Sequence, residues 1–378
     1  MSKLEELIVK FCPDGSEYKY LSEVLKIKNG KDYKGFAGGE IPVYGSGGVM
    51  TYIDRFVYDK PSVLIPRKGS IGNLYYIDIP FWTVDTIFYT EINTSLIEPK
   101  FVYYYLQTQH LERLNTAGGV PSLTQAVLNK VIIPLPPLPV QREIVRILDN
   151  FTELTAELTA ELTARKDQYE YYRDELLNFD GQRETEVQWM ILGEVADFRN
   201  GKGHEKVIVS EGEFIVINSK FISMDGTVKK YSQTQLSPLY VDDIAIVMSD
   251  LPNGRALAKC YIVNQDATYT LNQRIGTFRV KNNKYINTKF LYYVLNRNKQ
   301  LLRYDNGVDQ TNLKKDEILN INFPIPSIGE QQRIVSILDR FDTLCNDLTS
   351  GLPAEIEARR KQYEYYRDKL LTFKEKVK

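Results

Sequence analysis

Two carboxylates and a lysine near the N-terminus stand in an order that some metal-dependent nucleases use. Asp14 follows a proline, and Glu17 and Lys19 come shortly after it. In such a site the carboxylates hold Mg²⁺ and the lysine polarises the reacting phosphate. Only two residues separate Asp14 from Glu17, whereas the usual arrangement places the two carboxylates on a pair of strands. The spacing therefore favours a turn followed by a strand over a nuclease site.

The rest of the sequence contains few residues for acid–base, nucleophilic or metal chemistry. The two histidines, His110 and His204, are far apart, and the three cysteines show no C-x-x-C spacing. No G-x-S-x-G, Walker-type or G-x-G-x-x-G segment is present, and the runs GFAGGE and YGSGG lack the lysine that a phosphate loop needs. We therefore predict a non-enzyme with no metal or cofactor of its own.

The length and charge of the chain limit its class. With 378 residues it is long enough for two or three domains, and 48 basic against 49 acidic residues leave a formal net charge of −1. This balance argues against a polycation that coats nucleic acid, so any nucleic-acid surface must be local. The sequence has no signal-peptide layout and no run of 18 apolar residues. We expect a cytoplasmic protein outside the membrane.

The sequence contains one unit of about 190 residues twice. QYEYYRDELLNF (168–179) returns as QYEYYRDKLLTF (362–373), with two of the twelve positions changed. IVRILDNF returns as IVSILDRF, and FVYYYL returns as FLYYVL. Each helix motif follows a proline-rich segment, VIIPLPPLPVQ in the first copy and INFPIPSIGEQ in the second. The chain is therefore an internal duplication.

Each unit begins with short strands and turns. Runs such as SVLIP, NLYYI, DIAIV, CYIV and IGTFRV are rich in β-branched and aromatic residues and are bounded by Gly, Pro, Asn and Asp. A helix over 100–113, and its counterpart over 288–303, is expected to interrupt these strands. We expect the tyrosines of these two helices to lie in the core and at its rim.

Each unit ends in a long helix. Between 140 and 179 there is no Gly or Pro, and apolar residues recur every three or four positions, which predicts a helix about 60 Å long. In the second copy, Ser327 and Glu330 predict a capping box, while Gly351 and Pro353 predict a kink or restart. An apolar stripe of this length needs a partner helix, and the other copy is the nearest candidate.

The two long helices differ by one short insertion. The copies are offset by 190 residues at Ile144 but by 194 at Tyr169, and the shorter region reads TELTAELTAELTA. Four residues make slightly more than one helical turn, about 6 Å, so a tetrad can be gained or lost while the stripe stays roughly aligned. The pattern predicts a helix that acts as a molecular ruler.

This layout resembles the specificity (S) subunit of Type I restriction–modification systems. The proline-rich segments, the helix starts QREIVRILD and QQRIVSILD, and the duplicated rods carry the resemblance over nearly the whole chain. The resemblance implies an α+β fold with two similar target recognition domains and two long antiparallel helices that form a coiled coil, related by a pseudo-twofold internal duplication. It places the recognition domains at 1–139 and 181–328 and the spacer helices at 140–180 and 329–378.

The resemblance also implies a function. Each recognition domain would bind one half of a bipartite, asymmetric site in double-stranded DNA, and the paired helices would set the spacer between the halves. The subunit would have no catalysis of its own. It would recruit two methylation subunits, which use S-adenosylmethionine, and in the restriction complex two ATP-dependent restriction subunits. Members of the family often carry TAEL-type tetrads in the first rod, as this sequence does.

Recognition of DNA needs hydrogen-bonding side chains at base edges and Lys or Arg at phosphates. Both kinds gather in loops between the expected strands. The candidate contact residues are Lys28, Asn29, Lys31, Arg67, Lys68, Ser70, Asn73, Arg199, Asn200, Lys202, Asn218, Lys220, Asn253, Arg255, Gln273 and Arg274. RKGSIGN aligns only approximately with SDLPNGR, as expected if the halves bind different sequences. His204, in NGKGHEK, is a further residue that could approach DNA.

Two other interpretations remain open at this point. The rods could pair while the globular halves bind protein, which would make the chain a structural adaptor. The chain could also be a stand-alone nuclease that uses Asp14, Glu17 and Lys19. The tyrosines at the ends of the rods, 169–172 and 363–366, suit either helix packing or a surface for a partner.

Overall fold

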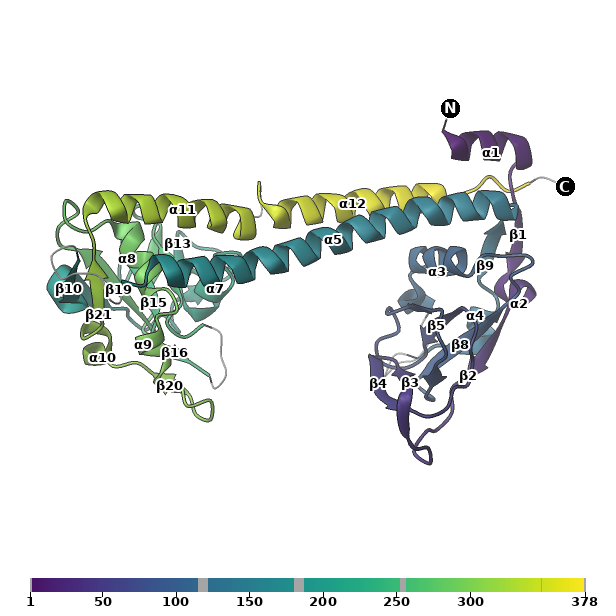
Figure 1. The fold of residues 1–378 in the computed structure, drawn as a ribbon, viewed down its shortest axis with the longest axis horizontal. Helices are drawn as coiled ribbons and strands as arrows, with labels where there is room; N and C mark the ends of the chain where they lie inside the picture. The colour runs from purple at the N-terminus through teal and green to yellow at the C-terminus, as the bar shows by residue number, and fades with distance from the viewer. Residues whose placement is uncertain (1, 115–121, 180–186, 252–255, 348, 377–378) are drawn as a thin grey trace. The chain divides into compact units, whose positions relative to one another are not determined.

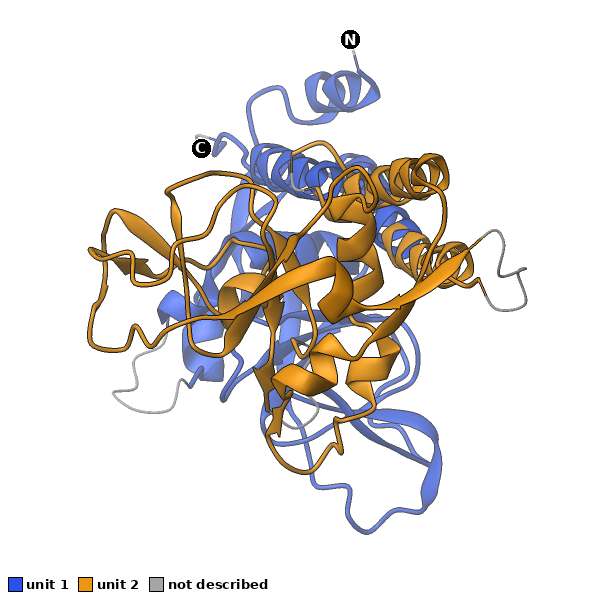
Figure 2. Cartoon of the chain, turned by 90° about the vertical axis from the view of Figure 1, so that its left-hand side faces the viewer, with its two compact units in different colours: residues 1–161, 354–378 blue, residues 162–353 orange. Residues whose placement is uncertain are grey.

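The computed structural model describes residues 2–114, 122–179, 187–251, 256–347 and 349–376 (Figure 1). The chain forms two compact units, coloured separately in Figure 2. Unit 1 contains residues 1–161 and 354–378, and unit 2 contains residues 162–353. Each unit therefore combines one mixed α/β domain with part of the helix α5 (Leu138–Leu176) and part of the second long helical region.

Unit 1 is built on a four-stranded sheet with the order β2-β8-β5-β6 and a three-stranded sheet with the order β4-β3-β7. A separate antiparallel pair, β1 with β9, leads into α5. The strands are β1 (Glu17–Tyr20), β2 (Leu25–Asn29), β3 (Gly38–Gly45), β4 (Gly48–Ile53), β5 (Ser62–Pro66), β6 (Tyr75–Ile77), β7 (Trp82–Thr83), β8 (Ile87–Ile92) and β9 (Ile132–Leu135). The helices other than α5 are α1 (Lys3–Phe11), α2 (Leu21–Val24), α3 (Pro99–Thr108), the 3₁₀ turn η1 (Leu111–Leu114) and α4 (Gln125–Leu128).

Unit 2 repeats this plan. The sheet β11-β19-β15-β17 corresponds to β2-β8-β5-β6, and the pair β10 with β21 corresponds to β1 with β9. The strands are β10 (Gln188–Ile191), β11 (Ala196–Asn200), β12 (Ile208–Val209), β13 (Phe214–Ile217), β14 (Tyr231–Ser232), β15 (Ile244–Val247), β16 (Ser249–Asp250), β17 (Cys260–Ile262), β18 (Tyr269–Leu271), β19 (Ile275–Val280), β20 (Thr311–Asn312) and β21 (Asn322–Ile325). The helices are α6 (Leu192–Val195), α7 (Ser219–Ser223), α8 (Thr288–Leu295), α9 (Lys299–Leu302), α10 (Lys315–Leu319) and α11 (Ile328–Asn346), and α12 (Leu352–Leu370) follows.

The strand predictions are confirmed, because the buried runs SVLIP, DIAIV and IGTFRV form β5, β15 and β19. Each unit also has its own core, which joins the sheet to a long helix. In unit 1, Phe88 and Phe101 share a buried cluster with Ile144 and Leu148 of α5. In unit 2, Phe278 and Phe290 are buried together with Ile334 and Leu338 of α11. The tyrosine-bearing helices α3 and α8 supply the middle layer of these cores, as expected.

The helices α3 and α8 are shorter than the sequence predicts. The expected helices over 100–113 and 288–303 each break after the tyrosine motif, at a residue with left-handed backbone: φ is +46° at His110 and +58° at Arg297. A left-handed residue turns the chain out of the helical path and ends the ladder of helical hydrogen bonds. The N–H of Arg297 instead donates to the carbonyl oxygen of Ala258 at 2.8 Å.

The break in the second long helix is confirmed. Helix α11 ends at Asn346 and α12 begins at Leu352. A Cβ atom at Gly351 would lie 2.4 Å from the carbonyl oxygen of Thr343, so only glycine fits the tight return. At the other end of α11, the Ser327 hydroxyl accepts from the N–H of Glu330 at 3.3 Å, while the Glu330 carboxylate pairs with Arg333 instead. Only half of the predicted capping box forms.

Within each unit, the long helices pack on one another. In unit 1, Phe151 of α5 stacks on Tyr366 of α12 at 5.6 Å between ring centroids. In unit 2, Tyr172 of α5 stacks on Phe341 of α11 at 5.8 Å. The prediction that each apolar stripe is covered by the other copy is confirmed inside each unit. No helix among the described residues is both long and apolar enough to cross a membrane.

The two ends of the chain meet in unit 1. The N–H of Ser16 donates to the carbonyl oxygen of Lys374 at 2.8 Å, and the N–H of Lys376 donates back to Ser16 at 2.9 Å. Leu371, just after α12, is buried in the same core as Phe88 and Phe101. Residues 371–376 are therefore part of the structure of the first domain.

Candidate nucleic-acid interface

In unit 1, three of the predicted contact residues, Lys31, Arg67 and Lys68, lie around the connection between β7 and β8. The N–H of Lys31 donates to Thr83 at 2.8 Å, and the N–H of Arg67 donates to Thr86 at 2.9 Å. The Lys68 ammonium lies 3.5 Å from the carboxylate of Asp85 in the same connection. Segments that are distant in sequence thus meet at one edge of the sheet, because β2 and β5 both pair with β8.

The side chains at this edge differ in their contacts within the protein and in their exposure to solvent. Arg67 lies over the ring of Phe88 at 5.0 Å, and its buried Nε has no partner among the described residues. Lys28 is held by Glu91 at 3.4 Å. The Asn29 side chain accepts from Gln125 at 3.2 Å, which adds a residue that the sequence analysis did not select. Five of the predicted residues have side chains exposed to solvent, namely Asn29, Lys31, Lys68, Ser70 and Asn73.

Unit 2 builds the equivalent edge around residues 271–276. The N–H of Lys202 donates to Leu271 at 2.9 Å, and the neighbouring Gly201 donates to Ile275 at 3.0 Å. Gln273 donates its amide to Glu205, and this hydrogen bond lowers the pKa of the Glu205 carboxyl below its ordinary value. Asn200, Lys202, Gln273 and Arg274 are exposed and lie around this single connection.

Two predicted contact residues of unit 2, Arg199 and Asn218, also form contacts within the domain. Arg199 approaches the buried carboxylate of Asp243 at 3.4 Å, and Arg279 pairs with the same carboxylate at 2.7 Å. Asn218 caps α7 by accepting from the N–H of Phe221 at 2.9 Å. Lys220 is exposed on α7. Asn253 and Arg255 lie outside the described residues.

The suggestion that His204 approaches DNA is wrong. The imidazole is fully buried, with one ring nitrogen 2.7 Å from the carbonyl oxygen of Lys202 and the other 2.8 Å from the hydroxyl of Thr270. It holds the loop that carries Lys202 against β18. His110, by contrast, is exposed at the end of α3 and lies 3.3 Å from Glu112.

A third segment completes each edge and was missed from the sequence. The N–H of Leu123 donates to Arg67 at 2.8 Å in unit 1, and the N–H of Leu313 donates to Met248 at 2.8 Å in unit 2. Met248 therefore has the same position in unit 2 that Arg67 has in unit 1. In unit 2 this segment also places the exposed side chain of Gln310 at the edge, where its amide donates to the hydroxyl of Ser249 at 2.7 Å. The sequence signal that could have revealed this segment is a polar residue followed by leucine before each proline-rich segment, Ser122-Leu123 in the first copy and Asn312-Leu313 in the second.

The nuclease-like residues do not form a site. Asp14 lies in a turn, and Glu17 and Lys19 lie on β1 opposite Leu135 and Ile133 of β9. The predicted turn followed by a strand is confirmed. Among the described residues, no group of three or more His, Cys, Asp or Glu side chains is placed to hold a metal ion.

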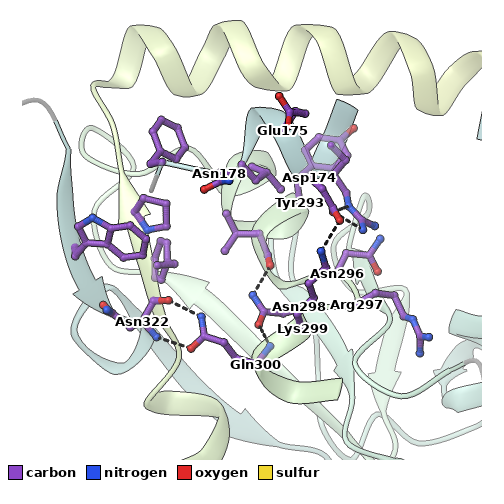
Figure 3. A pocket seen from close by; sticks show the side chains of 17 residues that line it. Asp174, Glu175, Asn178, Tyr293, Asn296, Arg297, Asn298, Lys299, Gln300 and Asn322 are labelled. Atoms are coloured by element: carbon purple, nitrogen blue, oxygen red, sulfur yellow. Dashed lines mark hydrogen bonds and ion pairs between the residues drawn. The ribbon is translucent and has the colours of Figure 1, made fainter. Parts of the chain in front are cut away.

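A cavity of about 480 Å³ lies elsewhere in unit 2, between the end of α5, β10, β21 and the turn from α8 to α9 (Figure 3). Three of its charged groups are paired, with Asp174 2.7 Å from Lys299 and 2.8 Å from Arg173. Gln300 and Asn322 exchange hydrogen bonds across it. None of the predicted contact residues is among the described residues that line it.

The tyrosines at the rod ends divide between packing and exposure. Tyr172 and Tyr366 stack on phenylalanines of the neighbouring helix. Tyr171 and Tyr365, at the same position of the repeated motif, are each 62% exposed. Tyr172 and Tyr366 therefore fit helix packing, whereas Tyr171 and Tyr365 stay candidates for a partner surface.

Comparison with known proteins gives a consistent result. The chain is 33% identical to the Escherichia coli type I restriction enzyme EcoR124I/EcoR124II specificity subunit, over 99% of this chain and 97% of the relative. It is 32% identical to a putative type I restriction enzyme specificity subunit from Haemophilus influenzae, over 94% and 95% of the two chains.

Solved structures show the same fold at low sequence identity. A chain from a study of complex assembly and conformational transition of the type I restriction–modification system matches with a TM-score of 0.64, at 16% identity, over 95% of this chain and 98% of that one. The S subunit from M. genitalium matches with a TM-score of 0.57, at 17% identity, over 94% and 96%.

The sequence model of the type I restriction modification DNA specificity domain matches residues 13–165 and again residues 184–358. These two matches coincide with the two copies of the repeated unit. The chain belongs to the family of type I restriction–modification specificity subunits, and it carries the specificity domain twice.

Proposed function

We propose that this chain is the DNA-recognition subunit of a type I restriction–modification complex and has no catalytic activity of its own. Each α/β domain binds one half of a bipartite, asymmetric target in double-stranded DNA. The long helices set the number of base pairs between the halves. Because its target is DNA, we place the protein in the cytoplasm.

One observation carries the proposal: the same backbone edge occurs in both units with different side chains. Residues of the β7–β8 connection and residues 271–276 receive matching main-chain hydrogen bonds from the neighbouring loops. Arg67 corresponds to Met248 in this arrangement, so a cation in one copy is replaced by a thioether in the other. A shared scaffold with different exposed groups is suited to binding two different base sequences.

We propose that the base and phosphate contacts come from the candidate residues selected from the sequence, with one amide side chain added in each unit. In unit 1 the set is Lys28, Asn29, Lys31, Arg67, Lys68, Ser70 and Asn73, with Gln125 added. In unit 2 the set is Arg199, Asn200, Lys202, Asn218, Lys220, Asn253, Arg255, Gln273 and Arg274, with Gln310 added. Lys28 and Arg199 are already held by carboxylates and are better suited to positioning than to base contact.

The partners in this proposal are two methylation subunits, which use S-adenosylmethionine, and two ATP-dependent restriction subunits. Tyr171 and Tyr365 support a partner that binds twice, because each is an exposed aromatic at the same position of a duplicated motif. Exposed aromatic side chains are frequent at protein interfaces. The near-zero net charge fits a subunit that shares the DNA with basic partners.

An exchange of one domain tests this function. Residues 1–136 are replaced by the matching segment of another specificity subunit, and DNA methylation by the assembled complex is mapped across a genome. One half of the split target should change while the other half and the spacing are kept, because each half is bound by one unit.

Two outcomes would contradict the proposal. If the unmodified complex methylates no defined split sequence, or if the exchange leaves both halves unchanged, the globular halves do not select DNA and an adaptor is favoured. Mg²⁺-dependent cleavage by the isolated chain, lost in Glu17→Ala, would favour a nuclease instead.

A further inference from the structure

A buried glutamine joins α5 to the recognition domain of unit 1. Gln141 has no exposed surface, and its amide nitrogen donates to the carbonyl oxygens of Leu96 at 3.1 Å and Pro136 at 2.6 Å. Its amide oxygen accepts from the N–H of Glu98 at 2.8 Å, at the residue that precedes α3. One side chain therefore fixes the first turn of α5 to the start of α3.

A second polar contact joins the same two helices further along. Asp149 lies two helical turns beyond Gln141, about 12 Å along α5. Its carboxylate accepts from the Tyr104 hydroxyl at 2.6 Å and from the Lys100 ammonium at 2.8 Å, and both donors lie on α3. Burial and the neighbouring Asp149 raise the pKa of Tyr104, so the phenol stays protonated and donates.

Unit 2 repeats the glutamine contact with the same atoms. Gln331 on α11 is fully buried and donates to the carbonyl oxygens of Tyr285 at 3.1 Å and Pro326 at 2.9 Å. Its amide oxygen accepts from the N–H of Asn287, the residue that precedes α8, at 2.8 Å. The partners are main-chain groups, so the contact does not depend on the side chains of the recognition domain.

Unit 2 also repeats the aspartate contact. Asp339 stands at the same distance from Gln331 as Asp149 does from Gln141. It accepts from the Tyr293 hydroxyl at 2.7 Å and from the Lys289 ammonium at 2.6 Å. The helix α3 is therefore joined to α5 at two separated points, and α8 is joined to α11 in the same way.

A neighbouring contact between the same helices is not repeated. In unit 1, Arg142 forms an exposed ion pair with the side chain of Glu98. The second copy has Gln332 and Asn287 at these positions, so the pair has no equivalent there. The chain thus keeps the glutamine contact and the aspartate contact in both copies, while the ion pair beside them differs.

Hydrogen bonds at two points fix the position of one helix on another more strictly than apolar packing alone. Ile144 and Leu148 are buried between Gln141 and Asp149, and such apolar contacts tolerate small sliding and rotation of one helix on the other. Hydrogen bonds depend steeply on distance and angle. Two sets about 12 Å apart therefore oppose both translation and rotation of α3 on α5.

We propose that Gln141 with Asp149, and Gln331 with Asp339, are positioning residues that hold each recognition domain on its long helix at one angle and thereby enforce one spacing between the half-sites. The inference rests on the proposed function. A spacing changed by one base pair moves a half-site by about 3.4 Å and rotates it by about 35° around the DNA axis. A domain held at two points cannot follow this movement, whereas a loosened domain can.

The test uses the assembled methylation complex and a library of DNA duplexes. Every duplex carries both half-sites, with the normal spacing or with one base pair more or fewer. The measured quantity is the ratio of methylation at altered spacing to methylation at normal spacing. For Asp149→Asn, and independently for Asp339→Asn, we expect this ratio to rise about tenfold, with the half-site sequences unchanged.

The control is Arg142→Gln, which removes the exposed ion pair and gives the first copy the residue that the second copy has. It should leave the ratio unchanged. A purely structural role for the aspartates would lower methylation at every spacing alike, so an unchanged ratio in both aspartate variants overturns the inference. If those variants fail to assemble, Tyr104→Phe and Tyr293→Phe, which remove one hydroxyl each, decide in the same way. If the unmodified complex methylates no split target, the proposed function itself fails.

Discussion

Asp342 shows how one side chain can carry an energetic cost in this protein. It lies half-buried on α11, accepts a hydrogen bond from Asn346 at 2.9 Å, and shares its surroundings with the carboxylates of Asp225 and Asp339. Burial is the main cause of the raised pKa of Asp342, and the two neighbouring carboxylates add to it. The charged form of this group is therefore poorly accommodated in the folded state.

We expect Asp342→Asn to raise the free energy of unfolding at neutral pH by about 1 kcal/mol, because the amide keeps an acceptor for Asn346 and removes the charge. The folded pKa lies above the ordinary value of 3.8, so the folded state binds the proton more tightly. The stability of the unmodified protein should fall relative to the variant as the pH rises from 3.8 through the raised pKa. Thermal unfolding at several pH values measures this difference.

Asp347 provides a control of opposite sign. Hydrogen bonds from Ser350 and Thr349 lower its pKa to about 2. Its contribution to stability is present above pH 3.8 and is lost as the pH falls towards 2. Asp347→Asn should therefore be less stable than the parent at neutral pH. If both variants shift stability in the same direction, the explanation by local charge is wrong.

The candidate contact residues could be selected from the sequence only as groups. Charged and amide side chains in loops were a sufficient signal for Lys31, Lys68, Gln273 and Arg274, which lie at the two edges. Arg199 looked equivalent to them, because its buried partner Asp243 lies just before β15, 44 residues further along the chain, and leaves no local trace in the sequence. His204 failed for the same reason, since Thr270 is distant along the chain.

At the level of elements, the ends of the tyrosine helices carry a measurable strain. His110 has φ of +46°, a conformation that costs a residue with a Cβ about 1 kcal/mol. Its contact with Glu112 is exposed and contributes little. We expect His110→Gly to raise the free energy of unfolding by about 0.5–1 kcal/mol and His110→Val to lower it, as measured by thermal or denaturant unfolding.

Arg297 is the matched comparison, because it has nearly the same backbone conformation, with φ of +58°. Its guanidinium donates to the carbonyl oxygen of Leu257 at 3.0 Å, and glycine would lose that bond. Arg297→Gly should therefore gain less stability than His110→Gly. If Arg297→Gly gained as much stability as His110→Gly or more, backbone strain and the lost hydrogen bond would not explain the difference between the two sites.

Element prediction succeeded where the pattern was long and local. The 39-residue helix α5 followed from its apolar repeat and the lack of Gly and Pro, and the break before α12 followed from Gly351 and Pro353. The ends of α3 and α8 could not be predicted, because they are set by distant partners. The hydrogen bond from Arg297 to Ala258 is an example, since the two residues are 39 positions apart in the chain.

At the scale of the whole molecule, the tetrad region of α5 gives a direct test of the ruler. Inserting one further TAEL after Ala164 adds about 6 Å and turns the helix by about 40° beyond a full turn. Both half-sites should remain the same, and their spacing should grow by one to two base pairs. Methylation mapping of the assembled complex measures both quantities together.

A two-residue insertion at the same place is the control. It rotates the following part of α5 by about 200°, which directs its apolar stripe away from the helix that it packs on. Complex formation and methylation should then be lost. Unchanged spacing after the tetrad insertion would refute the ruler.

The duplicated architecture was the feature most accessible from the sequence, because a repeated unit appears in the letters themselves. The sequence did not show which residues belong to each of the two units. Unit 2 is one continuous segment, whereas unit 1 requires residues from both ends of the chain, including the buried Leu371.

This division has a consequence for synthesis on the ribosome. All residues of unit 2 emerge before residue 354, while the first domain waits for the final helix and for the backbone pairing of Ser16 with Lys374 and Lys376. The domain made first is thus completed last. A premature stop codon near the 3′ end of the gene would spare unit 2 and damage the domain encoded at the opposite end.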